Sequence, residues 1–433
     1  MPAAWVGAVV QSKESSTKPA NPSILTINGG SSSIRFAVYE AGEALLPRLQ
    51  GKIDRIGSEG MNLIVKEPQG KPQQPLALPA RDRHTAVIAL LDWLEASPIF
   101  ASVQAVGHRV VHGMKHSEPE LVTPALLAEL RRITPYAPDH LPRQISLIDA
   151  FGKRHPRLPQ VACFDTAFHR SMPPVAKLFP IPRRLSAAGV ERYGFHGLSY
   201  EYLMGELGRL DPQAVKGRVI LAHLGNGASL AAVHNGKSID TSMGFTPTAG
   251  LMMSTRTGDL DPGLAYYLAR TERMTPSQFH HMVNHESGLL GVSESGSDMR
   301  DLLAKEGVDS RAAEAVALFC YQTKKWIGSF AAVLGGLDTL IFAGGIGENA
   351  PPIRARICDG LSFLGMELSE ARNQETAAII STDASRATVR VIRTDEEMTI
   401  ARSVWRTLGF AQSGGLGLST ALTKDIPKIR KAK

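Results

Sequence analysis

Two stretches of small residues between apolar runs are the most chemically informative parts of this chain. The first is LTINGGSSSIRF, residues 25–36, and the second is ILAHLGNGASLAAVHNGK, residues 220–237. In each, an apolar run ends in a polar residue, Asn28 or His223, before a turn rich in Gly and Ser and a returning apolar run. Because glycine has no side chain, such turns let several backbone N–H groups approach one anion. The pattern predicts two phosphate-binding hairpins.

Two such hairpins in one chain are the plan of a duplicated actin-like ATPase or kinase. A third glycine-rich stretch, TLIFAGGIGEN at Thr339–Asn349, follows an apolar run, and the next segment, PPIRARICDG, can begin a helix. The glycines allow close backbone approach, and a helix N-terminus favours an anion. Alone, this stretch favours an ordinary glycine-rich turn. Together with the hairpins it indicates contact with a nucleotide.

Charged residues at the ends of apolar runs could serve phosphoryl transfer. Arg109 lies in VGHRVVHG and Arg256 in MMSTRTGDLDPG, and arginine forks stabilise the charge on a transferring phosphoryl group. Asp165 ends the run ACFD, while Glu396 and Glu397 open a helical segment. These carboxylates suit Mg²⁺, but each is equally suited to capping a turn or a helix, and each arginine to a surface ion pair.

The composition bounds the class of protein. With 433 residues, 43% hydrophobic and 21% charged, the chain is expected to fold as a globular protein of two domains. No apolar run is long enough to span a membrane, and the net charge of +7 comes partly from the basic segment KDIPKIRKAK. We expect small anionic substrates, no nucleic acid and no membrane. Three widely spaced cysteines favour a reducing cytoplasm over a disulfide or zinc framework.

Apolar runs and helical periodicity alternate along the chain, which favours α/β layers. Strands are expected at residues 24–27, 34–39, 103–111, 161–164, 219–224, 230–234, 339–343 and 388–392, and helices at 85–96, 124–134, 262–269, 311–334 and 396–408. Lys66–Arg81 is expected to be a Pro- and Gln-rich surface loop. The remaining signals predict a tight hairpin turn at Asn235–Gly236 and a solvated helix face at His280, His281 and His285.

These elements divide the chain into two lobes with a ligand cleft between them. The boundary is expected near residues 164–168, and a return crossing near Arg393. The predicted parts are a flexible extension at 1–22, a first domain at 23–165 plus 394–412, a second domain at 166–393, and a basic tail at 413–433.

Nine blocks of the sequence together resemble the acetate and propionate kinase family, and they occur in that family's order from Ile24 to about Leu408. They are NGGSSSIRF, GHRVVHG, FDTAFH, RYGFHGLSY, HLGNGAS, MGFTPTAGLMMSTRTGDLDPG, SGLLGVSESGSDMRD, FAGGIGEN and RTDEEMTIAR. The resemblance implies duplicated actin-like, ribonuclease H-like α/β domains of the acetate and sugar kinase, Hsp70 and actin superfamily, with a cleft between them. It also implies a homodimer formed through the second domain.

The activity implied is ATP-dependent phosphorylation of a short-chain carboxylate, acetate to acetyl phosphate with ADP as the other product, by direct in-line transfer. ATP or ADP is the co-substrate, and the implied metal is Mg²⁺, with Mn²⁺ as an alternative. The roles implied for individual residues are metal binding by Asn28 and Glu396, catalysis by Asp165, His196 and Arg256, and substrate binding by Arg109, Val111, His140, Phe195 and Pro247. Those implied to contact the nucleotide or its phosphates are Ser31, Ser33, Arg35, His223, Leu224, Gly225, Asn226, Gly227, Asp298, Met299, Arg300, Gly345, Ile346, Gly347, Glu348 and Asn349.

Four departures from the family pattern leave the choice of acid open. Arg35 replaces a common Lys, Met114 a Gly, and Thr248–Ala249 a Leu-Glu pair. Asp139 replaces an apolar residue before His140, and its carboxylate would repel a small anion if it pointed inward but not if it turned to solvent. Propionate kinase is the nearest alternative. A sugar or polyol kinase would need an Asp base, and a non-enzymatic or regulatory actin-like ATP-binding protein would need no acyl pocket.

Overall fold

The computed structural model describes residues 21–30, 33–57, 60–68, 70, 74–78 and 82–410. Ser31, nearly all of the predicted N-terminal extension, the whole predicted basic tail and part of the predicted loop at Lys66–Arg81 lie outside these ranges. Among the described residues, no helix is long and apolar enough to cross a membrane. Cys163, Cys320 and Cys358 are free and buried, and the cytoplasmic location stays a prediction.

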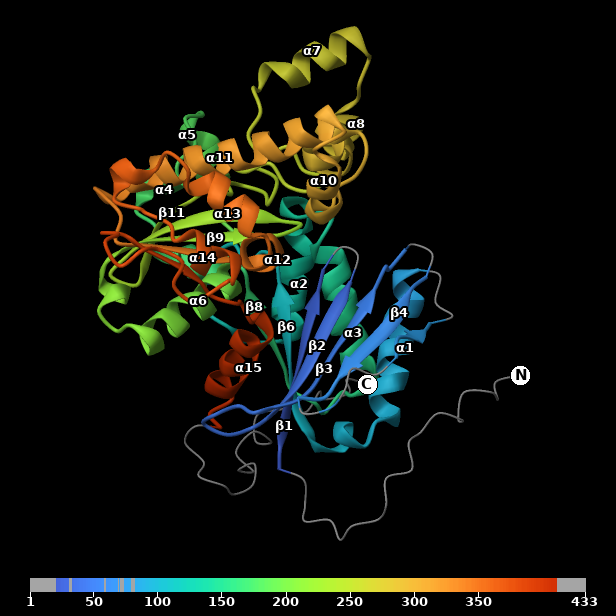
Figure 1. Ribbon diagram of the computed structural model, residues 1–433. Helices are drawn as coiled ribbons and strands as arrows, with labels where there is room; N and C mark the ends of the chain where they lie inside the picture. The colour runs from blue at the N-terminus through green and yellow to red at the C-terminus, as the bar shows by residue number, and fades with distance from the viewer. Residues whose placement is uncertain are drawn as a thin grey trace, which may run out of the picture.

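Two mixed β-sheets form the centres of the two halves of the molecule (Figure 1). The first has the order β5-β4-β3-β2-β1-β6-β8-β7 and the second the order β11-β10-β9-β12-β13. The strands of the first are β1 Ser23–Gly29, β2 Ile34–Glu40, β3 Pro47–Asp54, β4 Asn62–Lys66, β5 Leu76–Ala77, β6 Val103–Val110, β7 Glu120–Leu121 and β8 Gln160–Phe164. Those of the second are β9 Arg218–Leu224, β10 Ala228–His234, β11 Lys237–Thr241, β12 Thr339–Ala343 and β13 Thr388–Val391.

The two sheets repeat one topology. In each, three antiparallel strands (β3-β2-β1 and β11-β10-β9) continue into two parallel strands (β6-β8 and β12-β13). The predicted hairpins are β1–β2 and β9–β10, which occupy the same place in both sheets. The expected duplication of an actin-like α/β unit is therefore confirmed.

Helices cover both faces of each sheet, so the central strands are apolar on both sides. Every residue of β1 is buried. On the first sheet, α1 (Arg83–Ala96) and α3 (Leu141–Arg154) share one hydrophobic core with the strands, while α15 (Glu396–Thr407) packs on the opposite face. On the second, α11 (Ser310–Leu334) and α13 (Pro351–Cys358) lie on one face and α6 (Gly197–Leu210) on the other.

The chain after β13 returns to the first sheet, because α15 packs against β1 and β6. It also contacts α6, so these two helices lie between the sheets (Figure 1). The exact domain bounds given above stay predictions. The other helices are α2 Pro124–Arg132, α4 Pro174–Lys177, α5 Arg183–Ala187, α7 Gly263–Thr271, α8 Pro276–His281, α9 Gly288–Ser293, α10 Met299–Lys305, α12 Gly344–Asn349 and α14 Glu370–Gln374.

All the predicted strands and helices are present within a few residues of their expected bounds. The turn at Asn235–Gly236 is confirmed, with φ values of 51° and 71° that fit a two-residue hairpin. The interpretation of TLIFAGGIGEN as a strand followed by a turn is wrong in its second half, because Gly344–Asn349 forms the helix α12. Strands β3 and β4 and helices α3 and α6 were not predicted.

One glycine allows the two halves to meet. The Gly197 N–H donates to the Asp165 carbonyl at 2.8 Å, and a Cβ added to Gly197 would lie 2.1 Å from that oxygen. Gly197→Ala should therefore lower the free energy of unfolding by about 1–3 kcal/mol, the cost of overpacking. Urea denaturation measures it.

The matched control is Gly205→Ala in the same helix, where the nearest atom, Arg402 Nη1, lies 3.7 Å from an added Cβ. This change should raise the free energy of unfolding by about 0.5–1 kcal/mol, because alanine is the better helix former. Equal effects at the two positions would contradict the close contact inferred for Gly197.

Candidate active site

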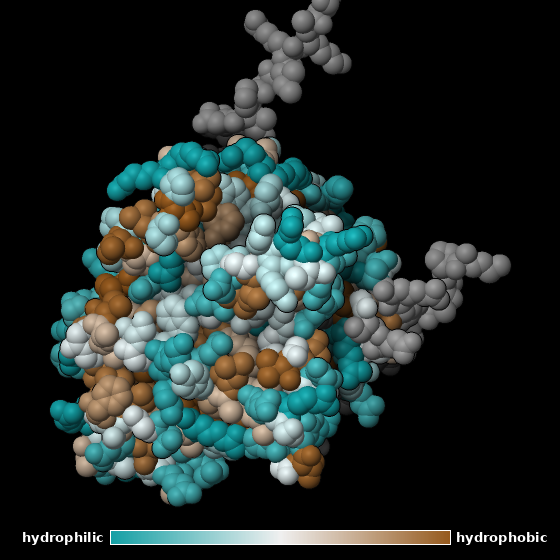
Figure 2. Space-filling view, turned by 90° about the horizontal axis from the view of Figure 1, so that it is seen from above, coloured by the Kyte–Doolittle hydropathy of each residue, from teal (hydrophilic) through white to brown (hydrophobic). Residues whose placement is uncertain are grey.

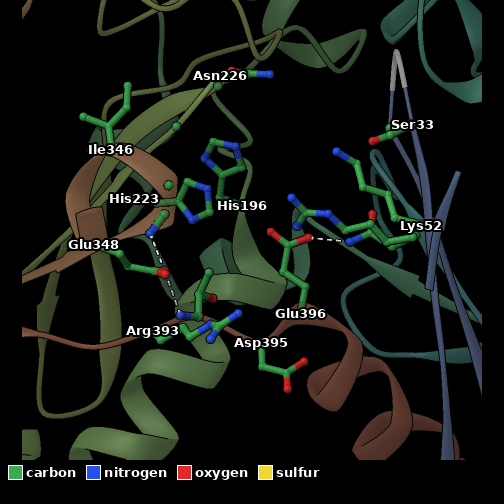
Figure 3. A pocket seen from close by; sticks show the side chains of 18 of the residues that line it. Ser33, Lys52, His196, His223, Asn226, Ile346, Glu348, Arg393, Asp395 and Glu396 are labelled. Atoms are coloured by element: carbon green, nitrogen blue, oxygen red, sulfur yellow. Dashed lines mark hydrogen bonds between the residues drawn. The ribbon is translucent and has the colours of Figure 1, made fainter. Parts of the chain in front are cut away.

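A cavity of about 1130 Å³ lies between the two sheets. Its walls come from both hairpins, from the start of α10, from α12 and from the start of α15. Figure 3 shows His196 and His223 side by side on one wall, with Glu396 facing them and Ser33 and Lys52 on the far side. Elements far apart in sequence thus meet at one space, as expected for the cleft of a duplicated fold.

Most of the residues singled out from the sequence line this cavity. They are Asn28, Ser33, Arg35, Arg109, Val111, His140, Phe195, His196, His223, Gly225, Asn226, Gly227, Pro247, Arg256, Asp298, Met299, Arg300, Gly345, Ile346, Glu348, Asn349 and Glu396. Asp165, Leu224 and Gly347 do not line it and are buried behind its walls. The structure therefore brings together residues from both lobes, with these three as supporting positions.

A buried ion pair stands at the carboxyl end of the first sheet. Arg109 Nε and Nη2 donate to Asp165 Oδ2 at 2.9 and 2.5 Å, and Arg109 Nη1 donates to Asn28 Oδ1 at 3.3 Å. Glu396 Oε2 lies 3.9 Å from Arg109 Nε and accepts a bond from Asn28 Nδ2 at 2.8 Å. Burial by itself would lower the pKa of Arg109, but Asp165 and Glu396 raise it above the ordinary arginine value. Arg109 is therefore a fixed cation at the cleft wall.

Oxygen ligands for a divalent cation gather beside this pair. The Asn28 amide also donates to Glu397 Oε1 at 3.1 Å, so two adjacent carboxylates face one amide. Burial and Glu396 raise the pKa of Glu397. Asp165 Oδ1 is buried and has no hydrogen-bond partner within the described part of the chain.

These groups fit Mg²⁺. The described residues contain no group of three or more His, Cys, Asp or Glu that could hold a metal by itself. Magnesium is typically held by one or two carboxylates together with substrate phosphates and water. Asn28 and Glu396 would supply the protein oxygens, with Glu397 beside them on the cavity wall.

Gly227 in the second hairpin lies close to a histidine and an arginine that come from other segments of the chain. A Cβ added to Gly227 would lie 3.2 Å from His196 Nε2 and 3.5 Å from Arg256 Nη1. His196 adopts a left-handed backbone with φ 60° directly before α6, a conformation that costs energy for a residue with a side chain. Burial and the neighbouring cationic groups hold the pKa of His196 well below its ordinary value. The glycine loop, a neutral imidazole and a guanidinium therefore converge.

One wall of the cleft is apolar and closely packed. Val111 and Phe195 are buried, and the Val111 N–H donates to Gln144 Oε1 at 2.8 Å. Arg256 Nη1 donates to the Pro247 carbonyl at 3.0 Å. Burial lowers the pKa of Arg256 to about 10, with Arg109 contributing, so it remains charged at neutral pH.

His140, at the start of α3, completes this wall. Burial, together with Arg256 and Arg109, lowers the pKa of His140 to about 3. Its neighbour Asp139 does not line the cavity, and its Oδ2 lies 3.0 Å from His280 Nε2 on α8. Of the two alternatives for Asp139, the structure shows the one in which the carboxylate turns away from the pocket.

A second wall of the cleft, which the sequence predicts to contact the nucleotide, is formed by the Gly225–Gly227 loop, the start of α10 and α12. Asp298 caps α10 by accepting from the Arg300 N–H at 2.9 Å. Glu348 was expected to line the nucleotide, yet its Oε1 already accepts from the Gly344 N–H at 2.9 Å and the Thr394 N–H at 3.1 Å (Figure 3). Its carboxylate therefore ties α12 to the segment before α15.

The chain is similar to known proteins over most of its length. The sequence pattern of the acetokinase family matches residues 23–402. The chain belongs to the acetokinase family. An acetate kinase from Rhodopseudomonas palustris (strain ATCC BAA-98 / CGA009) is 46% identical over 391 residues, covering 88% of this chain and 98% of the relative.

Propionate kinases are also similar. One from Citrobacter rodentium is 43% identical over 390 residues, covering 88% of this chain and 96% of the relative. The solved structure of a propionate kinase from Francisella tularensis superposes with a TM-score of 0.82 at 34% identity, covering 88% of this chain and 98% of that one. The chain is therefore a kinase of the acetate and propionate kinase family, which uses ATP as co-substrate and generally a divalent metal.

Sequence reading missed the hydroxyl groups that hold the cleft histidines. Ser229 Oγ lies 2.8 Å from His196 Nδ1, and Ser199 Oγ lies 2.8 Å from His223 Nδ1. Tyr200 and Thr394 contact these serines in turn. Ser199 follows His196, the residue just before α6, by three residues and lies in the first turn of that helix. That spacing was the one available signal.

The Arg109–Asp165 pair predicts a large stability effect. Asp165→Asn should lower the free energy of unfolding by about 3–5 kcal/mol, because it leaves a buried guanidinium without its carboxylate. Adding Arg109→Met should recover part of that loss. Urea denaturation of the single and double variants measures the coupling.

An exposed pair serves as the control. Arg131 Nη2 lies 2.8 Å from Asp149 Oδ1, with side-chain exposures of 53% and 31%. Asp149→Asn should cost less than about 1 kcal/mol. A loss for Asp165→Asn as small as this would show that Arg109 is adequately solvated without Asp165.

Proposed function

We propose that this protein phosphorylates a short-chain carboxylate with ATP, giving an acyl phosphate and ADP reversibly, and that acetate is its preferred acid. The observation that carries the proposal is the shared cavity of Arg109 and Arg256. Both line the space between the two glycine hairpins, and a buried apolar wall of Val111 and Phe195 lies beside them. One guanidinium can hold a carboxylate while the other faces the phosphoryl group.

The chemistry asks for positioning and charge neutralisation rather than a strong base. A carboxylate is already ionised and nucleophilic at neutral pH. Arg109 would hold the acid, while Arg256 and His196 would stabilise the charge spread over the transferring phosphoryl oxygens. The two hairpins would contact the nucleotide phosphates through their N–H groups. When bound at Asn28 and Glu396, Mg²⁺ would neutralise phosphate charge.

The position of Asp165 argues against a hydroxyl acceptor. A sugar or polyol kinase needs a carboxylate base within hydrogen-bond reach of the acceptor hydroxyl. Here Asp165 is fully buried, does not line the cavity, and accepts both close bonds from Arg109. Asp165 therefore holds Arg109 in place, and the charged Arg109 side chain favours an anionic substrate over a hydroxyl acceptor.

The preference for acetate over propionate rests on the acid side of the cleft. Val111 and Phe195 are 2% and 1% exposed and belong to a packed core, so they cannot easily move aside for a longer acid. Because Asp139 is turned toward His280, its charge does not face the acid. One methylene changes binding in an apolar pocket by only about 1–3 kcal/mol, so propionate stands as the second candidate. The similar relatives named for each acid support both.

Trapping of acyl phosphate with hydroxylamine tests the proposal. Purified protein with Mg·ATP should give product with acetate and propionate and little with butyrate or glycerol, and the kcat/KM ratio of the two short acids decides the preference. Arg256→Ala should lower turnover by roughly 10³-fold, the scale of other phosphoryl-stabilising arginines. Nucleotide binding without acid-dependent product would leave the regulatory, actin-like alternative.

The homodimer implied by the resemblance has a suitable surface on α7. No residue of this helix is buried, and Tyr266 and Tyr267 are 72% and 59% exposed. The helix projects from the second lobe (Figure 1), and on the face toward which it projects hydrophobic side chains interrupt the polar surface (Figure 2). We propose that a second copy covers α7 in a symmetric dimer.

Light scattering during gel filtration tests the dimer. The protein should elute with twice the chain mass, and a Tyr266→Glu, Tyr267→Glu double variant should shift it to the mass of one chain. Val175→Glu, at an apolar residue that is 79% exposed on α4, is the control that should remain dimeric. A single-chain mass for the unaltered protein would remove the proposal.

A further inference from the structure

Two histidine–serine contacts connect the start of helix α6 with the β9–β10 hairpin, and in each contact the histidine and the serine come from different elements. His196, the residue just before the helix, and Ser199, in its first turn, form one side, and the hairpin contributes His223 and Ser229, which are directly paired across the two strands. His196 Nδ1 lies 2.8 Å from Ser229 Oγ, and His223 Nδ1 lies 2.8 Å from Ser199 Oγ. The two imidazoles stack with centroids 4.3 Å apart. Each element therefore orients the other's histidine.

A second hydroxyl stands behind each serine. The Tyr200 hydroxyl lies 2.5 Å from Ser229 Oγ, and Thr394 Oγ1 lies 2.7 Å from Ser199 Oγ. Tyr200 is fully buried, and burial raises the pKa of its phenol, which keeps its proton. A phenol is a stronger donor than an aliphatic alcohol, so Tyr200 donates to Ser229. The Ser229 proton is then directed to His196 Nδ1.

A third Ser–His pair has a proton order that its own partners fix. His169 Nε2 lies 3.0 Å from the Phe195 carbonyl oxygen, and His169 Nδ1 lies 2.8 Å from Ser238 Oγ. A carbonyl oxygen only accepts, so a neutral His169 carries its proton on Nε2 and Ser238 donates to Nδ1. His169 does not line the cleft.

We propose that Ser229 and Ser199 are positioning residues that hold His196 and His223 in the tautomer with the proton on Nε2, so that two neighbouring ring N–H groups face the phosphate-binding loop. The inference rests on the proposed phosphoryl transfer for its purpose. Phosphate oxygens only accept, so a ring nitrogen without a proton would face them unfavourably. The geometry agrees, because Cβ atoms added to Gly227 and Gly225 would lie 3.2 Å from His196 Nε2 and 3.9 Å from His223 Nε2.

The tautomer matters because each ring is neutral and has one N–H to place. Burial and the nearby titratable groups of His223, Arg109, Arg256 and His169 lower the pKa of His196. Burial also lowers the pKa of His223, against the opposing charge of Glu396. With a single proton per ring, the partner of Nδ1 decides whether Nε2 donates or accepts.

The test combines ring-nitrogen NMR with kinetics on the full chain. Histidine ¹⁵N shifts, assigned with His196→Gln and His223→Gln, should report protonated Nε2 in both rings of the resting protein. Ser229→Ala should move proton density to Nδ1 of His196 and lower kcat by about 10–100-fold, the range for partners that orient a reacting group. The KM for ATP should change less than about threefold, the pattern of an interaction made in the transition state.

Three further variants separate orientation from folding. Tyr200→Phe and Thr394→Val remove only the outer hydroxyls and should each cause a smaller loss of kcat with mixed tautomers. Ser238→Ala is the matched control: it removes the same kind of bond from His169, whose tautomer the Phe195 carbonyl still holds. Its stability should fall as in Ser229→Ala, with kcat within about threefold of the unaltered protein.

Two outcomes would overturn the inference. One is protonated Nδ1 on His196 in the unaltered protein, and the other is a loss of kcat in Ser229→Ala no larger than in Ser238→Ala. If the unaltered protein forms no acyl phosphate from any acid, the proposed function fails instead. The NMR arm then still decides the tautomer by itself.

Discussion

The buried pairing of Arg109 with Asp165 is the interaction on which the rest of the site depends. Two charges taken out of water are stable together only when their remaining hydrogen-bond capacity is also satisfied. Asn28 and Glu396 supply part of it, with Asn28 Oδ1 3.3 Å from Arg109 Nη1 and Glu396 Oε2 3.9 Å from Arg109 Nε. These residues come from β6, the end of β8, the end of β1 and the start of α15. The pair thus fixes the carboxyl end of the first sheet as one unit.

The same aspartate links that unit to the second lobe. Its backbone carbonyl accepts from Gly197 at 2.8 Å, and the residue before Gly197 is His196 in its left-handed conformation. A strained backbone persists only where its surroundings hold it. Here the hold comes from Asp165 on one side and from Ser229 on the other. Asp165 therefore helps to position both His196, which is proposed to stabilise the phosphoryl group, and Arg109, which is proposed to bind the acid.

Much of the fold and of the site could be predicted, because the decisive signals were local. Short, mostly apolar runs such as SILTING indicate a buried strand from the sequence alone, and this one is buried along its whole length. β3 was missed because only Leu49 and Ile53 of its eight residues are fully buried, so its sequence reads as polar. Helix α12 was missed because glycines indicate a turn, and the bond from the Gly344 N–H to the Glu348 carboxylate has no recognisable sequence signature.

The supporting shell could not be predicted, because its contacts join residues far apart in sequence. Ser229 is 33 residues from His196, and Thr394 is 195 residues from Ser199. Hydroxyl residues are common in strands and helices, and no spacing distinguishes one that orients an imidazole. Asp139 shows the same limit: its residue type left two orientations open, and only the position of His280, 141 residues away, decides between them.

The charge distribution of the cleft follows from these contacts. The buried histidines are neutral, so the positive charge at its centre comes from Arg109 and Arg256, which do not titrate near neutral pH. A cleft built on protonated imidazoles would lose charge as pH rises through about 6–7. This one keeps its charge, and its histidines contribute directed N–H dipoles. The arginines therefore supply the positive charge, and the histidines supply oriented N–H donors. Transfer of a phosphoryl group between two anions would use both.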